Sequence, residues 1–339
     1  MARRARVGTR RLAAGAAAGL VLGVTACGGN GGDDGAKGER VMVGLITKRD
    51  TNPFFVKMKE AAQQAAKANN VELLTAAGKS DTDNQSQVTA IENMTTRGAK
   101  GILITPADSK AIVPAVEKSR ATGVIVIALD TPTEPQSAVD ALYATDNKKA
   151  GVLIGRWAKE KFAEEKKRPK IAMLDLAPGI SVGQLRHDGF LEGFGIKDGS
   201  PEIVGAVNTE GDTAKGQTGM EQLLQKDPGT NLVYSINEPS GFGAATALRR
   251  ARKDDVTIVS VDGGCEAIRN GIKKGVIDAK SQQYPQNMAR LGVEAVAKAA
   301  RGGAKPSGYQ DTGVTLITDD PVDGVESKDS TYGLENCWG

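Results

Sequence analysis

The chain has 339 residues, of which 40% are hydrophobic and 25% charged, values typical of a soluble globular protein with room for two domains. Its net charge of +3 depends on five arginines that precede Leu12, and without them 39 basic residues stand against 41 acidic ones. The rest of the chain has no basic surplus, so nucleic acid is not an expected partner.

The first 27 residues, 1–27, have the layout of a lipoprotein export signal. Five arginines lead into the apolar run Leu12–Val24, whose 13 residues are too few for a membrane span, which needs ~20. The run ends in Val24-Thr25-Ala26-Cys27, which resembles a lipobox and implies lipidation of Cys27 after cleavage. An ordinary signal peptide with an incidental cysteine is the alternative, and both Sec and twin-arginine export stay open.

Residues 28–40 form a glycine-rich segment with almost no apolar side chain. This composition predicts a flexible tether with a reach of ~20 Å. The expected protein is therefore exported and lipid-anchored to the outer face of the cell membrane, and it touches the membrane only through that anchor.

From residue 41 onward, short β-branched runs alternate with helical segments. The predicted strands form two sets: Val41–Thr47, Val71–Ala76, Gly101–Thr105 and Val124–Asp130, then Lys170–Leu176, Ile203–Val207, Asn231–Asn237 and Val256–Asp262. Successive strands start 23 to 33 residues apart in both sets. This shared cadence predicts an α/β protein with two similar doubly wound parallel-sheet domains.

Three further pieces complete the order. Residues 143–147 lie between the two sets and are expected to cross between the domains, while Val276–Gln283 and Gly313–Thr318 resemble strands near the end. Composition leaves open whether the chain crosses back there. The expected helix caps are Asp83 or Asn84 for the helix up to Arg97, Asp108 or Ser109 for the helix ending before Gly123, and Asp212 or Thr213 for the helix ending near Gln225.

The helix expected over Pro53–Ala68 begins directly after Asn52, a polar residue at the exit of the first strand. Phe54 and Phe55 are adjacent, so on a helix they point about 100° apart. We expect one of them to look out over the carboxyl edge of the sheet, where open α/β sheets bind ligands. The alternative is that both rings belong to the core.

Catalysis, metal binding and cofactor binding are not expected. His187 is the one histidine, and no G-x-S-x-G elbow, P-loop or dinucleotide fingerprint accompanies it. Polar residues beginning at Asp81 follow calcium-loop spacing, but the sixth position is Ser86 instead of glycine. A helix cap with exposed turns is the favoured interpretation of that segment.

Polar residues stand at the exits of three predicted strands, namely Asp130, Asn237 and Asp262. Each alone could be a helix cap, and Arg186, in a helix that follows the strand ending at Leu176, could be a surface arginine. Together with an aromatic face, these groups suit a polyhydroxylated ring. Its CH face would stack on phenylalanine, and its hydroxyls would bond to carboxylate, amide and guanidinium groups.

The order of motifs TNPFF, GILITPADS, VIALDT, YATDN, LRHDGF, SINEP and VSVDGG resembles that of periplasmic sugar-binding proteins of the ribose/fructose/galactose transporter class. The resemblance extends from Val41 to Thr318. The later motifs DGGC, SQQYP, TGVTLITDDP and CWG resemble the fructose-binding lipoprotein branch in particular.

This resemblance implies a two-lobed periplasmic-binding-protein fold with three hinge crossings, near Ala144–Asp146, Gln282–Gln283 and Gly313–Val314. The N-terminal lobe would comprise 41–144 plus 283–313, and the C-terminal lobe 145–282 plus 314–339. The implied ligand-binding residues are Asn52, Phe54, Phe55, Asp130, Arg186, Asn237, Asp262 and Gln283.

Two cysteines remain once Cys27 is lipidated. In an exported protein Cys265 and Cys337 are expected to form a disulfide, with two buried thiols as the alternative. The resemblance places both in the C-terminal lobe, which supports the pairing.

The sequence departs from the ribose type at three positions. Lys48 stands where that type tends to have a small hydroxyl residue, Thr131 where it has an arginine, and Val261 where it has an aromatic residue. The exchanges alter both the stacking and the hydroxyl pattern of the cleft. A sugar is therefore expected, but ribose is not singled out.

The function implied is that of an extracytoplasmic receptor, a monomer, that closes on a monosaccharide of the fructose or ribose kind. It would deliver the sugar to an ABC permease and its ATPase subunit. A sugar-sensing regulator that shares the two-lobed core is the alternative, although it would need a DNA-binding head where the export signal stands. An exported enzyme is disfavoured by the missing nucleophile and base.

Overall fold

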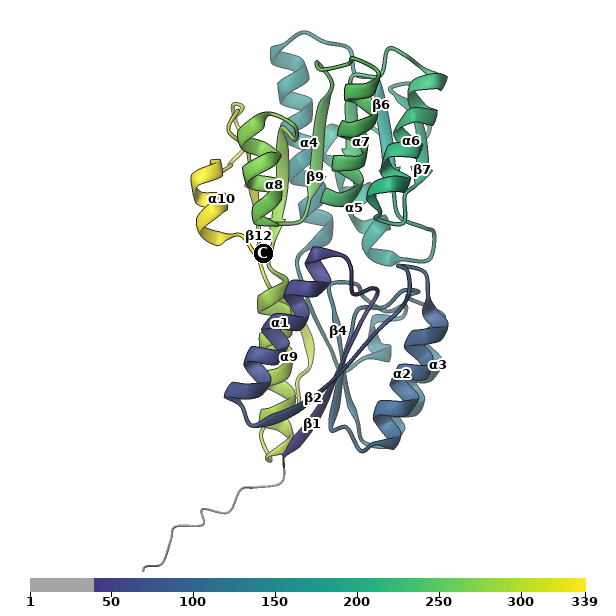
Figure 1. Ribbon diagram of the computed structural model, residues 1–339, viewed down its shortest axis with the longest axis vertical. Coiled ribbons are helices and arrows are strands. Elements are labelled where there is room, and N and C mark those ends of the chain that lie inside the picture. Colours follow the sequence, from purple (N-terminus) through teal and green to yellow (C-terminus); the bar gives the residue numbers. More distant parts are fainter. Residues whose placement is uncertain (1–39) are drawn as a thin grey trace, which may run out of the picture. The chain divides into compact units, whose positions relative to one another are not determined.

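The computed structural model describes residues 40–339, which form two six-stranded sheets with helices on both faces (Figure 1). The expected export signal, Cys27 and all of the expected tether except Arg40 lie outside the described residues. Within residues 40–339, the helices lack the combination of length and apolar character that a membrane crossing requires.

The first sheet has the strand order β11-β5-β4-β3-β1-β2, and all neighbouring strands are parallel. Its strands are β1 (Val41–Thr47), β2 (Val71–Ala77), β3 (Gly101–Ile104), β4 (Ile125–Leu129), β5 (Ala141–Ala144) and β11 (Gly308–Asp311). β5 has no counterpart among the predicted strands, because residues 143–147 were expected only to cross between the domains, and neither has β11. All four residues of β11 are exposed, so it lacks the apolar pattern that marks a buried strand.

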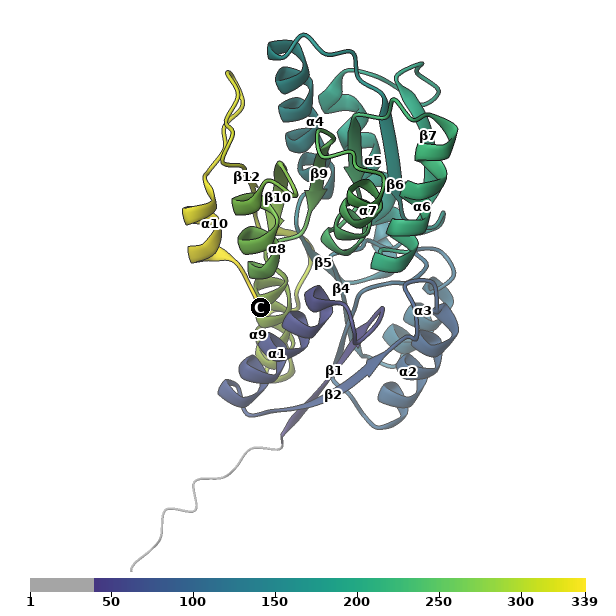
Figure 2. The same ribbon diagram turned by 45° about the horizontal axis from the view of Figure 1, so that its top comes forward.

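Helices cover both faces of this sheet. α1 (Pro53–Ala68) and α9 (Pro285–Ala300) lie side by side on one face, as both views show (Figures 1 and 2), and α2 (Asn84–Thr96) and α3 (Val113–Ala121) cover the other. Side chains of β1 alternate between the two layers: Leu45 packs with α1 and α9, and Ile46 packs with α2. Burial on both faces explains why the inner strands β1, β3 and β4 are continuous apolar runs.

The second sheet has the order β12-β10-β9-β8-β6-β7. Its strands are β6 (Ile171–Asp175), β7 (Ile203–Asn208), β8 (Leu232–Ser235), β9 (Thr257–Val261), β10 (Ala279–Gln283) and β12 (Val314–Ile317). The edge strand β12 runs antiparallel to β10, and the other pairs are parallel.

The helices of this half are α4 (Asn147–Glu164), α5 (Ser181–Phe194), α6 (Thr213–Lys226), α7 (Glu238–Arg250), α8 (Cys265–Asn270) and α10 (Ser330–Asn336). α4 and α5 pack one face, and α6 and α7 pack the other. The α4–α5 contact depends on glycine: a Cβ atom at Gly151 would overlap the backbone oxygen of Arg186, and one at Gly189 would overlap that of Lys148.

The chain passes between the sheets three times. It leaves β5 for α4 at 145–146, leaves β10 for α9 at Tyr284, and leaves β11 for β12 at 312–313. Gln283 ends β10 and is therefore part of the second sheet, whereas the family resemblance implies the first lobe. Gln283 pairs with Val314 of β12, a residue distant in sequence, and this pairing places it in the second sheet.

Three predicted helix starts are present and one is wrong. Asn52 precedes α1 as expected, Asp83 caps α2 by accepting from the Ser86 N–H, and Asp212 caps α6. Asp108 instead accepts from the N–H groups of Lys110 and Ala111 in the turn 109–112, and α3 starts directly after this turn without a side-chain cap. The Asp108 carboxylate, which the prediction expected to cap the first turn of the helix, is therefore bonded to the N–H groups of this turn.

Candidate ligand-binding site

The carboxyl ends of the strands bring all eight predicted ligand-binding residues around one small cavity of about 30 Å³. β1, β4, β8, β9 and β10 each end at this edge of their sheet. The cavity is lined by Lys48, Asn52, Phe54, Phe55, Asp81, Asp130, Leu176, Val182, Arg186, Asn237, Asp262 and Gln283. Loops of both sheets therefore build a single site.

The guanidinium of Arg186 on α5 joins polar groups from both sheets. Its Nη2 atom lies 3.2 Å from Asp130 Oδ1, and its Nη1 atom lies 3.8 Å from Asp262 Oδ1. Nε donates to Asn147 Oδ1 at 2.8 Å, and Nη1 donates to the Ile236 carbonyl at 3.1 Å. The arginine and both aspartates are almost fully buried, so each charge depends on the others for neutralisation.

Both aspartates have an unusual backbone conformation. Asp130 has a φ of 61° and Asp262 a φ of 124°, values that cost a non-glycine residue ~1–3 kcal/mol. Each directly follows a buried strand, β4 or β9. Such strain persists only where the surroundings hold the residue, and here both carboxylates face the same guanidinium.

Asn52 and Asn237 are helix caps as well as cavity residues. Asn52 Oδ1 accepts from the Phe54 N–H at 2.9 Å, and Asn237 Oδ1 accepts from the Ser240 N–H at 3.1 Å. Asn237 Nδ2 also donates to the Gly211 carbonyl at 3.1 Å. The two interpretations that the sequence left open, cap or ligand-binding residue, are thus compatible.

Phe54 and Phe55 are both buried, at 4% and 5% exposure, and pack edge to face with ring centroids 5.3 Å apart. The alternative that both rings belong to the core is confirmed, because both belong to the same apolar cluster beside α9. Both also line the cavity. The two rings lie in the first turn of α1, where they pack in the core of the first sheet and also line the cavity.

Four lining residues were not among the predicted ligand-binding residues: the apolar Leu176 and Val182 and the charged Lys48 and Asp81. Lys48 is 2% exposed, and its Nζ atom donates to Thr131 Oγ1 at 3.0 Å. Thr131 Oγ1 in turn donates to Asp130 Oδ2 at 3.0 Å. Lys48 directly follows β1, so the rule that selected Asp130, a charged residue at a strand exit, could have found it.

Two of the three departures from the ribose type, at Lys48 and Thr131, therefore form one contacting pair. Val261, the third, is fully buried in the second-sheet core and does not line the cavity. Burial lowers the pKa of the Lys48 ammonium and raises the pKa of the Asp81 carboxyl, since each charge loses water.

The carboxylate of Asp262 faces Arg186 and also accepts from Gln283, at the end of the neighbouring strand β10. Its Oδ1 atom accepts from Gln283 Nε2 at 2.7 Å. Burial raises the pKa of this carboxyl, and the charge of Arg186 opposes the shift. Within residues 40–339, Gln283 Oε1 has no hydrogen-bond partner although it is buried. An acceptor of this kind calls for a hydroxyl or N–H donor.

A larger groove of about 490 Å³ shares the lining residues Asn52 and Asp262 with the cavity and so lies next to it. Arg49, in the groove wall, bonds with Nε to Asp81 Oδ1 at 2.6 Å and with Nη2 to the Glu210 carbonyl at 2.8 Å; its Nη1 atom lies 3.5 Å from Asp212 Oδ2. The loops after β1 and β2 are thereby tied to the loop after β7.

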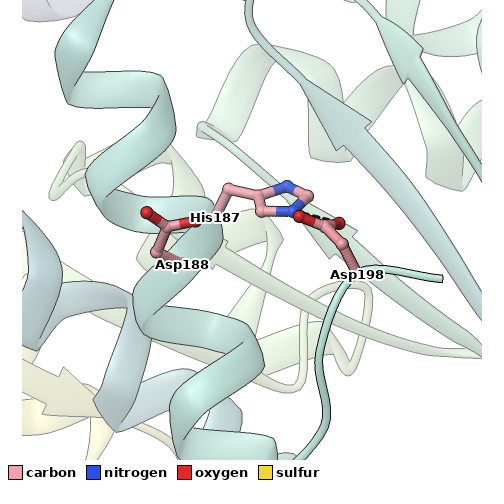
Figure 3. Close-up of side chains that lie close together, drawn as sticks. All are labelled: His187, Asp188 and Asp198. Carbon is pink, nitrogen blue, oxygen red and sulfur yellow. Dashed lines mark hydrogen bonds and ion pairs between the residues drawn. The ribbon is translucent and has the colours of Figure 1, made fainter. Parts of the chain in front are cut away.

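His187 lies outside the cavity, between carboxylates. The ligand atoms of His187, Asp188 and Asp198 come within 4.8 Å of one another, and Figure 3 shows the imidazole reaching from α5 toward Asp198. Nδ1 bonds to Asp175 at 2.9 Å and Nε2 to Asp198 at 3.0 Å. The bond to Asp175 is the main cause that raises the imidazole pKa to about 9. This is the environment of a protonated histidine, whereas a metal ligand needs a free lone pair.

Sequence comparisons identify relatives of known kind. The family model described as periplasmic binding protein domain matches residues 43–304. The ribose import binding protein of Bacillus subtilis (strain 168) is 32% identical over 253 residues, which cover 75% of this chain and 79% of that protein. The D-allose-binding periplasmic protein of Escherichia coli (strain K12) is 26% identical over 266 residues, or 76% and 84% of the two chains.

Solved structures resemble the chain in fold. A sugar transporter from Clostridium phytofermentans has a TM-score of 0.74 at 27% identity and covers 83% of this chain and 100% of its own. An ABC transporter solute binding protein from Mycobacterium smegmatis with bound glycerol has a TM-score of 0.74 at 26% identity, covering 88% and 99%.

The family match takes in most of both sheets and the residues that line the cavity, and the relatives named above are import or binding proteins. Membership among binding proteins agrees with a site built from buried, mutually paired polar groups. The chain belongs to the periplasmic binding protein family, and it is a solute-binding protein rather than an enzyme.

Proposed function

We propose that this protein is the extracytoplasmic solute-binding component of an ABC importer and that it binds a monosaccharide between its two lobes. The observation that carries the proposal is the buried cluster in which Arg186 meets Asp130 and Asp262 beside two phenylalanine rings. Carboxylates and a guanidinium satisfy sugar hydroxyls, and aromatic rings cover the apolar face of the sugar.

Binding requires the site to open and close. The cavity of about 30 Å³ is far smaller than the ~300 Å³ of ordinary ligand pockets. By way of the groove that Asn52 borders, a sugar therefore enters after the polar contacts between the lobes, such as that of Arg186 with Asp130, have separated. Its hydroxyls then replace these contacts, and the closed state is favoured by whatever the sugar touches on both lobes.

The sugar we propose is fructose or a ribose-like monosaccharide. Lys48 supports this choice, because an ammonium carries three N–H donors and its bond to Thr131 uses one. The remaining donors suit a ring or hydroxyl oxygen of the sugar, and Gln283 Oε1, which also lines the cavity, can accept from a sugar hydroxyl. Lys48 and Asp81 thus join the eight residues carried over from the motifs.

The proposal extends to export, anchoring and the cysteines. Cys27 is the proposed lipidation site on the strength of its lipobox-like motif, and it lies outside the described residues. Cys265 and Cys337 are the proposed disulfide, supported by a Cα–Cα distance of 5.0 Å, which lies in the range that disulfides span.

Calorimetric titration with D-ribose, D-allose, D-fructose and D-galactose tests the binding function. We expect at least one of these sugars to bind, and Asp262→Asn and Arg186→Ala to weaken that sugar about 30-fold or more, because each change leaves a buried charge without its partner. Failure of the parent protein to bind any of them would contradict the proposal.

Asp83→Ala is the matched control. Asp83 caps α2 through the Ser86 N–H and does not line the cavity, so the variant should lose ~1 kcal/mol of stability and keep its affinity. Asp212 is a poorer control because it also approaches Arg49 at 3.5 Å. Thermal unfolding of each variant separates lost binding from lost folding.

A further inference from the structure

The indole of Trp338 lies at the junction of the two lobes. Its backbone is tied to the second lobe: Trp338 N donates to the Gly263 carbonyl at 3.1 Å, and the Trp338 carbonyl accepts from the Cys265 N–H at 2.9 Å. Its ring is 2% exposed and belongs to the apolar cluster of the first sheet, with its centroid 5.8 Å from that of Phe54. One side chain therefore contacts a cavity ring across the junction.

Trp338 also holds two backbone segments of the site. Nε1 donates to the Gln283 carbonyl at 2.9 Å, so the indole fixes the end of β10. A Cβ atom at Gly263, the residue after Asp262, would lie 2.8 Å from Trp338 Nε1 and 2.7 Å from the Gln283 carbonyl. The three groups fit together only because residue 263 is glycine.

Gln283 and Asp262 are in turn bonded to each other, by side chain at 2.7 Å and by backbone at 3.1 Å. Any shift of the Trp338 ring therefore moves the amide with the unpartnered Oε1 atom and the carboxylate that faces Arg186. Trp338 itself does not line the small cavity, so its action is indirect.

The neighbouring Cys337 pairs with Cys265, the first residue of α8. The segment 329–339 is otherwise held by non-covalent contacts alone, namely the Trp338 hydrogen bonds, the bond of the Ser330 N–H to Asp319 and the packing of α10 (Ser330–Asn336) on the second-sheet core. The cysteine pair is the covalent link that keeps the indole against Gly263 and Phe54.

We propose that Trp338, clamped by the Cys265–Cys337 pair, is a positioning residue for the sugar site, so that sugar affinity depends on the redox state of these cysteines. This inference rests on the proposed sugar-binding function. Loss of the clamp frees the indole, loosens Gln283 and Asp262, and removes the surface on which Phe54 closes.

The matched pair Trp338→Phe and Trp157→Phe tests the positioning role. Trp157 on α4 is equally buried and makes the same kind of bond, Nε1 to the Asp320 carbonyl at 2.8 Å, away from the cavity. Both variants lose an indole bond to a backbone carbonyl, but only Trp338→Phe should lower sugar affinity, by about 10-fold. The probe is whichever of D-ribose, D-allose, D-fructose and D-galactose the parent binds most tightly.

Fluorescence supplies a readout that a purely structural role would not change. Trp157 and Trp338 are the two tryptophans of the chain. Because only Trp338 touches the other lobe, the change in emission on adding sugar should persist in Trp157→Phe and vanish in Trp338→Phe. An unchanged response in Trp338→Phe would overturn the inference.

The redox arm uses the Cys265→Ser/Cys337→Ser double variant and the reduced parent protein. Both should bind the sugar about 10-fold more weakly than the oxidised parent, with circular dichroism showing an intact fold. Equal affinity of oxidised, reduced and double-variant protein would contradict the clamp. A parent protein that binds no sugar would instead overturn the proposed function itself, so the two failures are distinguishable.

Discussion

His187 illustrates how a single residue couples this fold to pH. Two carboxylates raise the pKa of its imidazole from 6.5 to about 9, with the Asp175 bond as the largest cause. The folded-state pKa of His187 lies above the unfolded value. The contribution of His187 to the free energy of unfolding is therefore complete below about pH 6.5 and is lost as the pH rises through 9. We expect the free energy of unfolding to fall by ~2–3 kcal/mol over that range, as measured by urea denaturation.

The expected loss of stability is smaller than the full pKa shift implies, because water screens the ion pair with Asp198, whose side chain is 73% accessible. His187→Gln is the control, since it removes the titrating group and keeps the size of the side chain. The variant should show a flatter profile between pH 6.5 and 9. Identical slopes in parent and variant would rule out His187 as the source.

Individual residues also show how much of the site could be predicted from the sequence. All eight residues carried over from the motifs surround one cavity, because charged and amide residues at strand exits meet at one sheet edge. Lys48 obeys the same rule but was set aside as a departure from the ribose type. Asp81 was missed because its contact with Arg49 depends on two loops that no local pattern places together.

At the scale of elements, the α4–α5 contact controls where Arg186 lies. Gly189→Ala would drive a methyl group into the backbone of Lys148, and backbone can give way only by separating the helices. We expect a loss of ~1–3 kcal/mol in stability and weaker sugar binding, since Arg186 and Asn147 lie on the two helices concerned. Denaturant unfolding and calorimetry measure the two effects.

Gly241→Ala in α7 is the matched control, because its Cβ atom would lie 3.4 Å from the nearest neighbour, an ordinary contact. Alanine is favoured over glycine in helices by up to ~1 kcal/mol, so this variant should be neutral or more stable. A loss of stability as large as that of Gly189→Ala would refute the packing argument.

Elements with regular apolar patterns were predictable and those defined by distant partners were not. The predicted strands match the structure within a few residues, since burial on both faces produces continuous apolar runs. β11 was missed because its four exposed residues pair with β5 by backbone alone. Gln283 was assigned to the first lobe because its strand partner, β12, follows about thirty residues later.

For the whole molecule, Arg49 is the polar tie between the lobes that is easiest to remove. It bonds to Asp81 on one side and to Glu210 and Asp212 on the other. Arg49→Met should increase the radius of gyration of the sugar-free protein and weaken sugar binding about tenfold. Small-angle scattering with and without sugar measures the first effect.

Arg120→Met is the corresponding control, because Arg120 makes a similar set of bonds, to Asp140 and the Ala138 carbonyl, entirely within the first lobe. Its radius of gyration should equal that of the parent. If Arg49→Met behaves like Arg120→Met, the tie at Arg49 does not hold the lobes together.

The three passages between the sheets also set the order in which the protein can be completed. Strands β1 to β5 have emerged by residue 144, but α9, whose Met288 and Val293 pack against that sheet, comes after β10. A chain delivered from its N-terminus, by the ribosome or by an export channel, therefore holds an unfinished first lobe, in which the area that α9 later covers beside α1 stays open to water until residue 300 has appeared. The lobe that starts first must wait for nearly all of the other, so neither can mature as an independent nascent domain.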